Sequence, residues 1–149
     1  MTQRTAIIIL AALCLILAGY LVIGSLLIGL QDAGSWEKAT RSYVEEYHRW
    51  LSESPWSGWA RLEALAAGPE LSRIERLRRD LQDRNEWRYA GGDYRLLLQA
   101  GGKALVEADY WLDGGDDKRD GHETYLLEKT LQGIRVIKVM EGGSDDAGR

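Results

Sequence analysis

Sulfur and imidazole ligands are scarce in this sequence, which has one cysteine and two histidines among 149 residues. The single cysteine, Cys14, cannot form an intrachain disulfide, so the fold must depend on packing alone. Zinc is not expected, because no second thiol is available and the histidines are far apart in the chain. The net charge of −4 provides no concentrated positive surface, so we expect no nucleic acid partner.

An acidic loop over residues 113–122 is the one segment that invites a metal-binding interpretation. Aligned from Asp116, the calcium-loop pattern needs an oxygen ligand at its third position and a glutamate at its twelfth. The chain has Lys118 and Leu127 at those positions. The pattern therefore fails, and we expect neither a metal nor a cofactor.

An uncharged apolar run covers residues 6–30, after a short tail over residues 1–5. A helix of that length would extend about 37 Å, which exceeds the ~30 Å hydrocarbon core of a bilayer. The run is longer than the apolar part of a signal peptide and no small-residue cleavage site follows it. We therefore predict a single transmembrane helix over residues 6–30, with the lipid bilayer as a partner.

Charges on either side of this run give a preferred orientation. Arg4 and the amino terminus precede it, whereas Lys38 and Arg41 follow it among acidic residues. The prediction is a single-pass protein of the cell membrane, with a cytoplasmic N-terminus and an extracytoplasmic domain. Trp36 would then lie at the membrane interface, where an indole ring contacts both lipid and water.

Two further sets of residues are candidates for contacts with other proteins. Ser25 and Gly29 form a small-xxx-small pair that could pack against another helix in the membrane. Trp56 and Trp59 lie close together around a Ser-Pro break. Exposed tryptophans dominate the binding energy of many interfaces, whereas buried ones stabilise cores, and both interpretations stay open for this pair.

The rest of the chain predicts one α+β domain over residues 35–141, followed by a disordered tail over 142–149. Apolar residues at three- and four-residue steps predict a helix over 35–51. Proline residues near the start of the next two segments predict helices over 54–67 and 69–84.

After the helices, apolar residues alternate with polar ones, which is typical of strands with one buried face. The clearest example has one expected buried set: Ala104, Val106, Ala108, Tyr110 and Leu112. Gly101 and Gly102 predict a tight hairpin turn before it, and Gln132 and Gly133 predict another turn. The fold class is thus an α+β domain of three helices packed on a curved antiparallel sheet.

This order of elements resembles the cone-shaped nuclear transport factor 2-like superfamily, also called SnoaL-like or cystatin-like, and within it the IMS domain of plastid and cyanobacterial division proteins. The resemblance is carried by Trp87-Arg88-Tyr89, Lys103-Ala104-Leu105-Val106-Glu107-Ala108, Tyr125 and Gly133-Ile134-Arg135-Val136-Ile137. The chain has Ile134 where that family usually has Trp. The resemblance implies a non-enzymatic module that binds partner proteins outside the cytoplasm or in an intermembrane space.

We therefore expect a membrane-anchored protein-interaction or scaffold module that binds another membrane or envelope protein. One alternative is a subunit of a larger membrane assembly, such as a secretion or transfer machine. Another is a ligand-binding or catalytic cone, in which Tyr43, Tyr47 and Tyr110 could line a pocket. His48 and Asp109 would be its best candidate bases, but no acid-base constellation is recognisable, so no catalytic residue is assigned.

Overall fold

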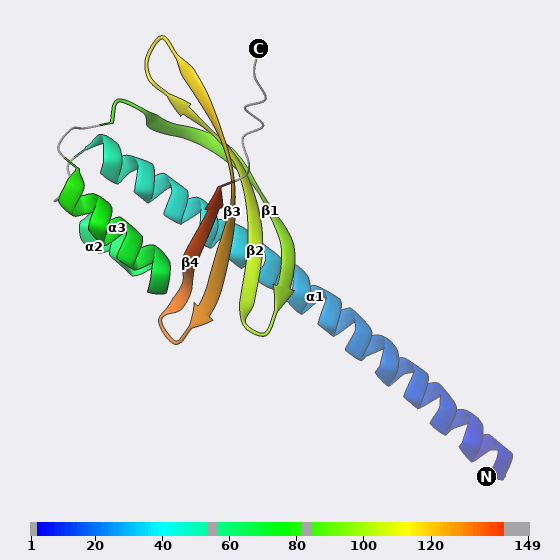
Figure 1. Cartoon of the computed structure of the whole chain (residues 1–149). Helices are drawn as coiled ribbons and strands as arrows, with labels where there is room; N and C mark the ends of the chain where they lie inside the picture. Colours follow the sequence, from blue (N-terminus) through cyan, green and yellow to red (C-terminus); the bar gives the residue numbers. More distant parts are fainter. Residues whose placement is uncertain (1–2, 54–56, 82–84, 142–149) are drawn as a thin grey trace. The chain divides into compact units, whose positions relative to one another are not determined.

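A four-stranded antiparallel sheet and three helical segments make up the described part of the fold (Figure 1). The computed structural model describes the backbone of residues 3–53, 57–81 and 85–141, and side chains at 11–23, 33–53, 57–81 and 85–140. The elements are α1 (Gln3–Ser52), α2 (Trp59–Leu65), α3 (Gly68–Asp80), β1 (Arg88–Ala100), β2 (Lys103–Asp113), β3 (Lys118–Thr130) and β4 (Gly133–Glu141).

The first helix joins the two helices that were predicted separately over 6–30 and 35–51. No proline lies between them, and a single interior glycine such as Gly34 costs a helix only about 1 kcal/mol. The backbone therefore continues as a helix. The chain nevertheless divides into two compact units, Met1–Gly34 and Ser35–Arg149.

The predicted transmembrane helix is not supported. Among the helices that the structure describes, none combines the length and the apolar character needed to cross a membrane. The length of α1 comes partly from its continuation into the charged segment after residue 31. The predicted fold of one membrane-spanning helix followed by three domain helices is therefore wrong, although the domain is α+β.

The helices α2 and α3 are shorter than predicted. Pro69 lies in the first turn of α3, where its missing N–H is not needed. The helix ends at Asp80, with Glu70 in its first turn and basic residues in its last, an arrangement that complements the helix dipole. The helix α2 begins at Trp59, and the predicted start at residues 54–56 lies outside the described residues.

The strands pair in the order β1-β2-β3-β4, each antiparallel to its neighbour. The predicted turn at Gly101 and Gly102 is confirmed, since both have positive φ, at 58° and 74°. The strand β3 begins earlier than expected, because Lys118 pairs with Asp113. Much of the predicted loop is thus strand.

The core lies between one face of the sheet and the helices. The alternation predicted for β2 is confirmed, and its five inward side chains are all buried. From the second half of α1 the core receives Trp36, Tyr43, Val44 and Trp50. On the β4 edge, the N–H of Ala67 donates to the carbonyl of Val136 at 2.9 Å. The segment after α2 thereby covers that edge.

Candidate functional site

Tyrosine rings from α1 and β3 meet on the inner face of the sheet. Tyr43 and Tyr47 lie four residues apart, hence on one face of α1, and their rings stack with centroids 5.9 Å apart. Tyr125 of β3 meets Tyr43 edge to face, also at 5.9 Å. Of the three tyrosines expected to line one pocket, Tyr43 and Tyr47 line one hollow and Tyr47 and Tyr110 line another.

An ion pair from α3, between buried Glu70 and exposed Arg73, completes this cluster. The Tyr43 hydroxyl donates to Oε1 of Glu70, whose side chain is 2% exposed. Arg73 donates to the same carboxylate from Nη2 at 2.7 Å and from Nε at 2.9 Å, and its guanidinium lies 5.4 Å from the Tyr47 ring centroid. Burial, and then the charge of Glu70, raises the pKa of Tyr43, while the hydrogen bonds to Glu70 raise the pKa of Arg73.

Two hollows adjoin the tyrosines. The first, of about 390 Å³, is lined by Tyr43, Tyr47, Arg73, Glu123, Tyr125 and Val139. The second, of about 420 Å³, lies between the end of α1, the segment before β1, the end of β2 and the first half of β3. Tyr47 and Glu123 also line it. Both volumes fall within the range of small-molecule sites. We call the second one the His48 hollow, after the histidine in its wall.

His48 is the most unusual group in that wall. It is 6% exposed, and its ring lies between Tyr47 and Tyr110, with centroid distances of 5.3 Å and 5.1 Å. Burial, and then the charge of Arg119, lowers the pKa of His48 to about 4. The imidazole is therefore neutral at pH 7, when it can donate one hydrogen bond and accept one.

The other candidate base, Asp109, is not near His48. It lies on the outer face of β2, because successive residues of a strand point to opposite faces. There its Oδ1 lies 2.5 Å from Nδ1 of His122 across the β2–β3 ladder. This hydrogen bond raises the pKa of His122. The structure therefore does not assemble the two bases considered from the sequence into one site.

Gly121 makes room for the Tyr110 ring, a relationship that sequence reasoning missed. The two residues are direct partners in the β2–β3 ladder, and a Cβ at position 121 would overlap the Tyr110 ring. The sequence signal was a glycine inside a strand pattern, which often marks a close approach. That signal was hidden because residues 113–122 were taken for a loop.

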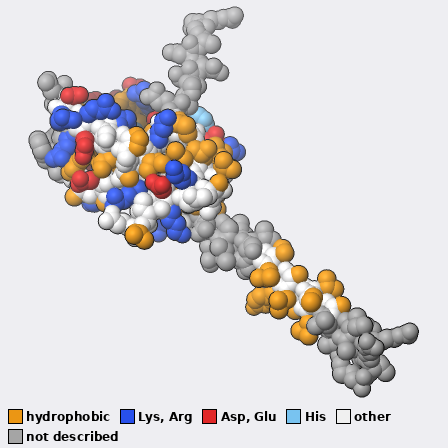
Figure 2. All heavy atoms as spheres, turned by 60° about the horizontal axis from the view of Figure 1, so that its bottom comes forward, with side chains coloured by type: hydrophobic (Ala, Val, Ile, Leu, Met, Phe, Trp, Pro, Cys, Tyr) orange, Lys and Arg blue, Asp and Glu red, His pale blue; other side chains and the backbone are white. Residues whose placement is uncertain are grey.

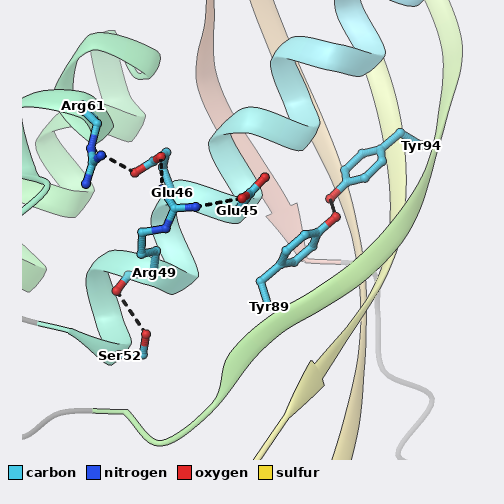
Figure 3. A network of polar contacts seen from close by, with 7 residues as sticks. All are labelled: Glu45, Glu46, Arg49, Ser52, Arg61, Tyr89 and Tyr94. Atoms are coloured by element: carbon cyan, nitrogen blue, oxygen red, sulfur yellow. Dashed lines mark hydrogen bonds and ion pairs between the residues drawn. The ribbon is translucent and has the colours of Figure 1, made fainter.

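A third hollow, of about 300 Å³, lies where the end of α1 faces the start of β1. Figure 3 shows the polar contacts around it: Arg49 bonds Glu46 at 2.6 Å and Glu45 at 2.8 Å, and Arg61 of α2 reaches Glu46 at 3.5 Å. The hydroxyls of Tyr89 and Tyr94 are 3.1 Å apart. Glu45, Glu46, Arg49 and Arg61 thus satisfy one another, and Glu53 and Arg88 complete the charged lining.

The described stretch of α1 over residues 11–23 exposes apolar side chains (Figure 2). Their exposed fractions lie between 54% and 82%. They are Leu13, Leu15, Ile16, Leu17, Tyr20, Leu21, Val22 and Ile23. Because these positions follow one another along a helix, they surround its axis, and such a helix is normally covered by another apolar phase.

The structure separates the other residues singled out from the sequence. Trp36 is 1% exposed in the core, so its ring is not available to a membrane boundary. Trp59 is half-buried, with its ring 5.9 Å from that of Trp50 and under the guanidinium of Arg78 at 4.4 Å. Trp56 lies outside the described residues, and so do the side chains of Ser25 and Gly29, which belong to α1.

In comparisons with known proteins, no family model, curated protein or solved structure matches this chain. The resemblance to the nuclear transport factor 2-like superfamily therefore stays a prediction.

Proposed function

We propose that this chain is a membrane-associated protein-interaction module, in which the apolar stretch of α1 associates with lipid and the α+β domain binds another membrane or envelope protein. The observation that carries the proposal is the exposure of eight large apolar side chains on residues 13–23. Covering a side chain such as leucine contributes about 1.5–3 kcal/mol, so these residues together favour association strongly.

The domain supports a binding role more than a catalytic one. Glu70 and Arg73 satisfy each other, and Asp109 lies on the face of the sheet opposite to His48. The predicted resemblance to a superfamily with partner-binding members agrees with this role. Because one fold can serve many functions, this resemblance adds to the proposal only as an analogy.

Membrane association is tested with the full chain and vesicles of phosphatidylcholine. We expect the wild-type chain to float with the vesicles, and a variant with Leu13→Gln, Leu17→Gln and Leu21→Gln to stay unbound, because the three changes remove about 5 kcal/mol or more of apolar transfer energy. The matched control carries Leu98→Gln and Leu131→Gln, which change exposed leucines of the domain. Recovery of the wild-type chain without vesicles, or equal flotation of both variants, would contradict the proposal.

Partner binding is tested by cross-linking the full chain in membranes and purifying the products after mild detergent extraction. A discrete heterologous product supports an interaction module, and a large native complex containing many chains indicates the alternative, a subunit of a membrane assembly. Recovery of the chain alone, at several cross-linker lengths, would argue against both.

A further inference from the structure

We propose that the His48 hollow binds a small organic carboxylate with a flat apolar body, whose negative group lies between Arg119 and His48. This inference goes beyond the interaction role proposed above, because it concerns a small ligand. It depends on the hollow alone and not on the apolar stretch of α1.

The first observation is a buried nitrogen without a partner. Nδ1 of His48 has no hydrogen-bond partner among the described residues, although the residue is 6% exposed. Leaving a buried polar atom unpaired costs about 1–3 kcal/mol, so native structures rarely do so without a reason. His48 lines a hollow of about 420 Å³, a volume in the range of small-molecule sites.

The second observation is a cation without a carboxylate partner in the same wall. Arg49 and Arg73 are each bonded to glutamates, whereas Arg119 forms no ion pair within the part of the chain that the structure describes. Arg119 and His48 both line this hollow. A guanidinium presents parallel N–H donors that match a carboxylate.

Glu123, a carboxylate of the same wall, does not form an ion pair with Arg119 in the described part of the chain. Glu123 is on the same strand face as Arg119, but four residues away, which corresponds to roughly 13 Å along a strand. Its carboxylate accepts a hydrogen bond from the Tyr125 hydroxyl. Asp120 and His122 also line the hollow, although they alternate along β3 with Arg119, Gly121 and Glu123.

Apolar groups supply the surface for the ligand body. The wall includes Leu51 from α1, Trp87 before β1, and Tyr110 and Leu112 from β2. Flat side chains such as Trp87 and Tyr110 favour a flat ligand, since offset stacking adds about 0.5–1.5 kcal/mol to the area buried. The hollow thus has a positive end next to an aromatic and aliphatic body.

The experiment titrates benzoate into the full chain, solubilised in detergent where needed, and follows the imidazole resonances of both histidines by NMR. We expect saturable shifts of the His48 signals with a dissociation constant on the order of 1 mM or tighter. Benzamide, which keeps the ring and lacks the charge, is expected to bind at least tenfold more weakly. His122 also lines the hollow, where its ring is exposed and bonded to Asp109, so the comparison of benzoate with benzamide and not the His122 signal serves as the control.

Two variants separate charge recognition from folding. Arg119→Gln is expected to weaken benzoate binding at least tenfold, while Arg95→Gln, which removes a cation paired with Glu107 on the outer face, is expected to leave it unchanged. A second readout is the pKa of His48: bound benzoate should raise it, since the anion favours the imidazolium against the opposing charge of Arg119. The other charged or titratable groups of the wall are unchanged in both variants; they are Tyr47, Tyr110, Asp120, His122 and Glu123.

Several outcomes would overturn the inference. They are the absence of His48 shifts in the folded wild-type chain, equal binding of benzamide, or unchanged binding by Arg119→Gln. Because vesicle flotation tests the apolar stretch of α1 and this titration tests the hollow, each proposal can fail without the other.

Discussion

The hydroxyl of Tyr43 donates a hydrogen bond to Glu70, which lies 27 residues further along the chain. Both side chains are almost fully buried, at 1% and 2% exposure. The bond joins α1 to α3, and Arg73 balances the carboxylate from the solvent side at 2.7 Å. A buried charge is tolerated when its hydrogen bonds are all satisfied, so this group of three should act as one unit.

Removal of the Tyr43 hydroxyl tests that unit. Tyr43→Phe is expected to lower the free energy of unfolding by about 1.5–3 kcal/mol, because the lost bond goes to a buried carboxylate. Urea denaturation measures it as a lower midpoint at constant slope. Glu75→Gln, on the exposed face of α3, should change stability by less than about 0.5 kcal/mol. If Tyr43→Phe is as stable as wild type, the bond does not contribute.

The lowered pKa of His48 should make the stability of the chain depend on pH. Its pKa is about 4 in the folded chain against 6.5 in the unfolded chain, so between these values only the unfolded chain binds the proton. Stability should therefore fall as the pH is lowered from 6.5 toward 4, by up to roughly 3 kcal/mol from this group. Denaturant midpoints between pH 7.5 and pH 4 measure the slope.

His48→Gln should flatten this dependence over that pH window. The matched control is His122→Gln, because the pKa of His122 is raised in the folded chain, so that below pH 6.5 it is protonated in both states and contributes no slope there. It should keep the acid slope of the wild-type chain. The interpretation rests on slopes and not on absolute stabilities, since His48→Gln also changes packing; an unchanged slope would show that His48 does not titrate as expected.

A larger residue at position 121 should destabilise the fold, because it would overlap the Tyr110 ring. Gly121→Ala places a methyl group where the Tyr110 ring lies, so we expect a loss of about 1–3 kcal/mol in the free energy of unfolding. The same change in a Tyr110→Leu background should cost less than about 1 kcal/mol, because the ring is gone. Thermal or urea unfolding of the four proteins gives the coupling energy. Equal costs in both backgrounds would show that the ring and residue 121 do not interact.

Trp59 distinguishes a core role from a docking role. Its ring lies between Trp50 and the guanidinium of Arg78, so Trp59→Ala should lower the free energy of unfolding by about 2–4 kcal/mol. Trp111→Ala is a useful comparison, because that ring is 40% exposed on the outer face and should cost less. Both are measured by urea unfolding. A Trp59→Ala variant of wild-type stability that fails to cross-link to its partner would instead support the docking interpretation.

The predictions made from strand patterns agreed best with the structure. The alternation along β2 and the glycine pair before it predicted the buried face and the turn that are observed. These features depend on neighbours one or two residues away, which is why they can be inferred from the chain itself. The first half of β3 was missed, because its charged residues are held in place by pairing with β2 and not by their own preference.

The helices show where local reasoning was insufficient. Residues 31–34 were left outside both predicted helices, yet nothing there forbids a helix, and α1 continues through them. The prediction of a membrane-spanning helix was wrong for the part of the chain that the structure describes. Trp36 was placed at a boundary on the basis of its position in the sequence, and it lies in the core instead.

Period and composition alone determined an α+β domain with an apolar amino-terminal segment, because burial of alternate residues and avoidance of water are local properties of the chain. Only the tertiary structure decided which polar groups meet. It brought Glu70 to Tyr43, placed His48 beside Tyr110, and put Asp109 on the other face of the sheet. Contacts between distant segments depend on strand register and on how helices cross the sheet, and neither is encoded in a single segment.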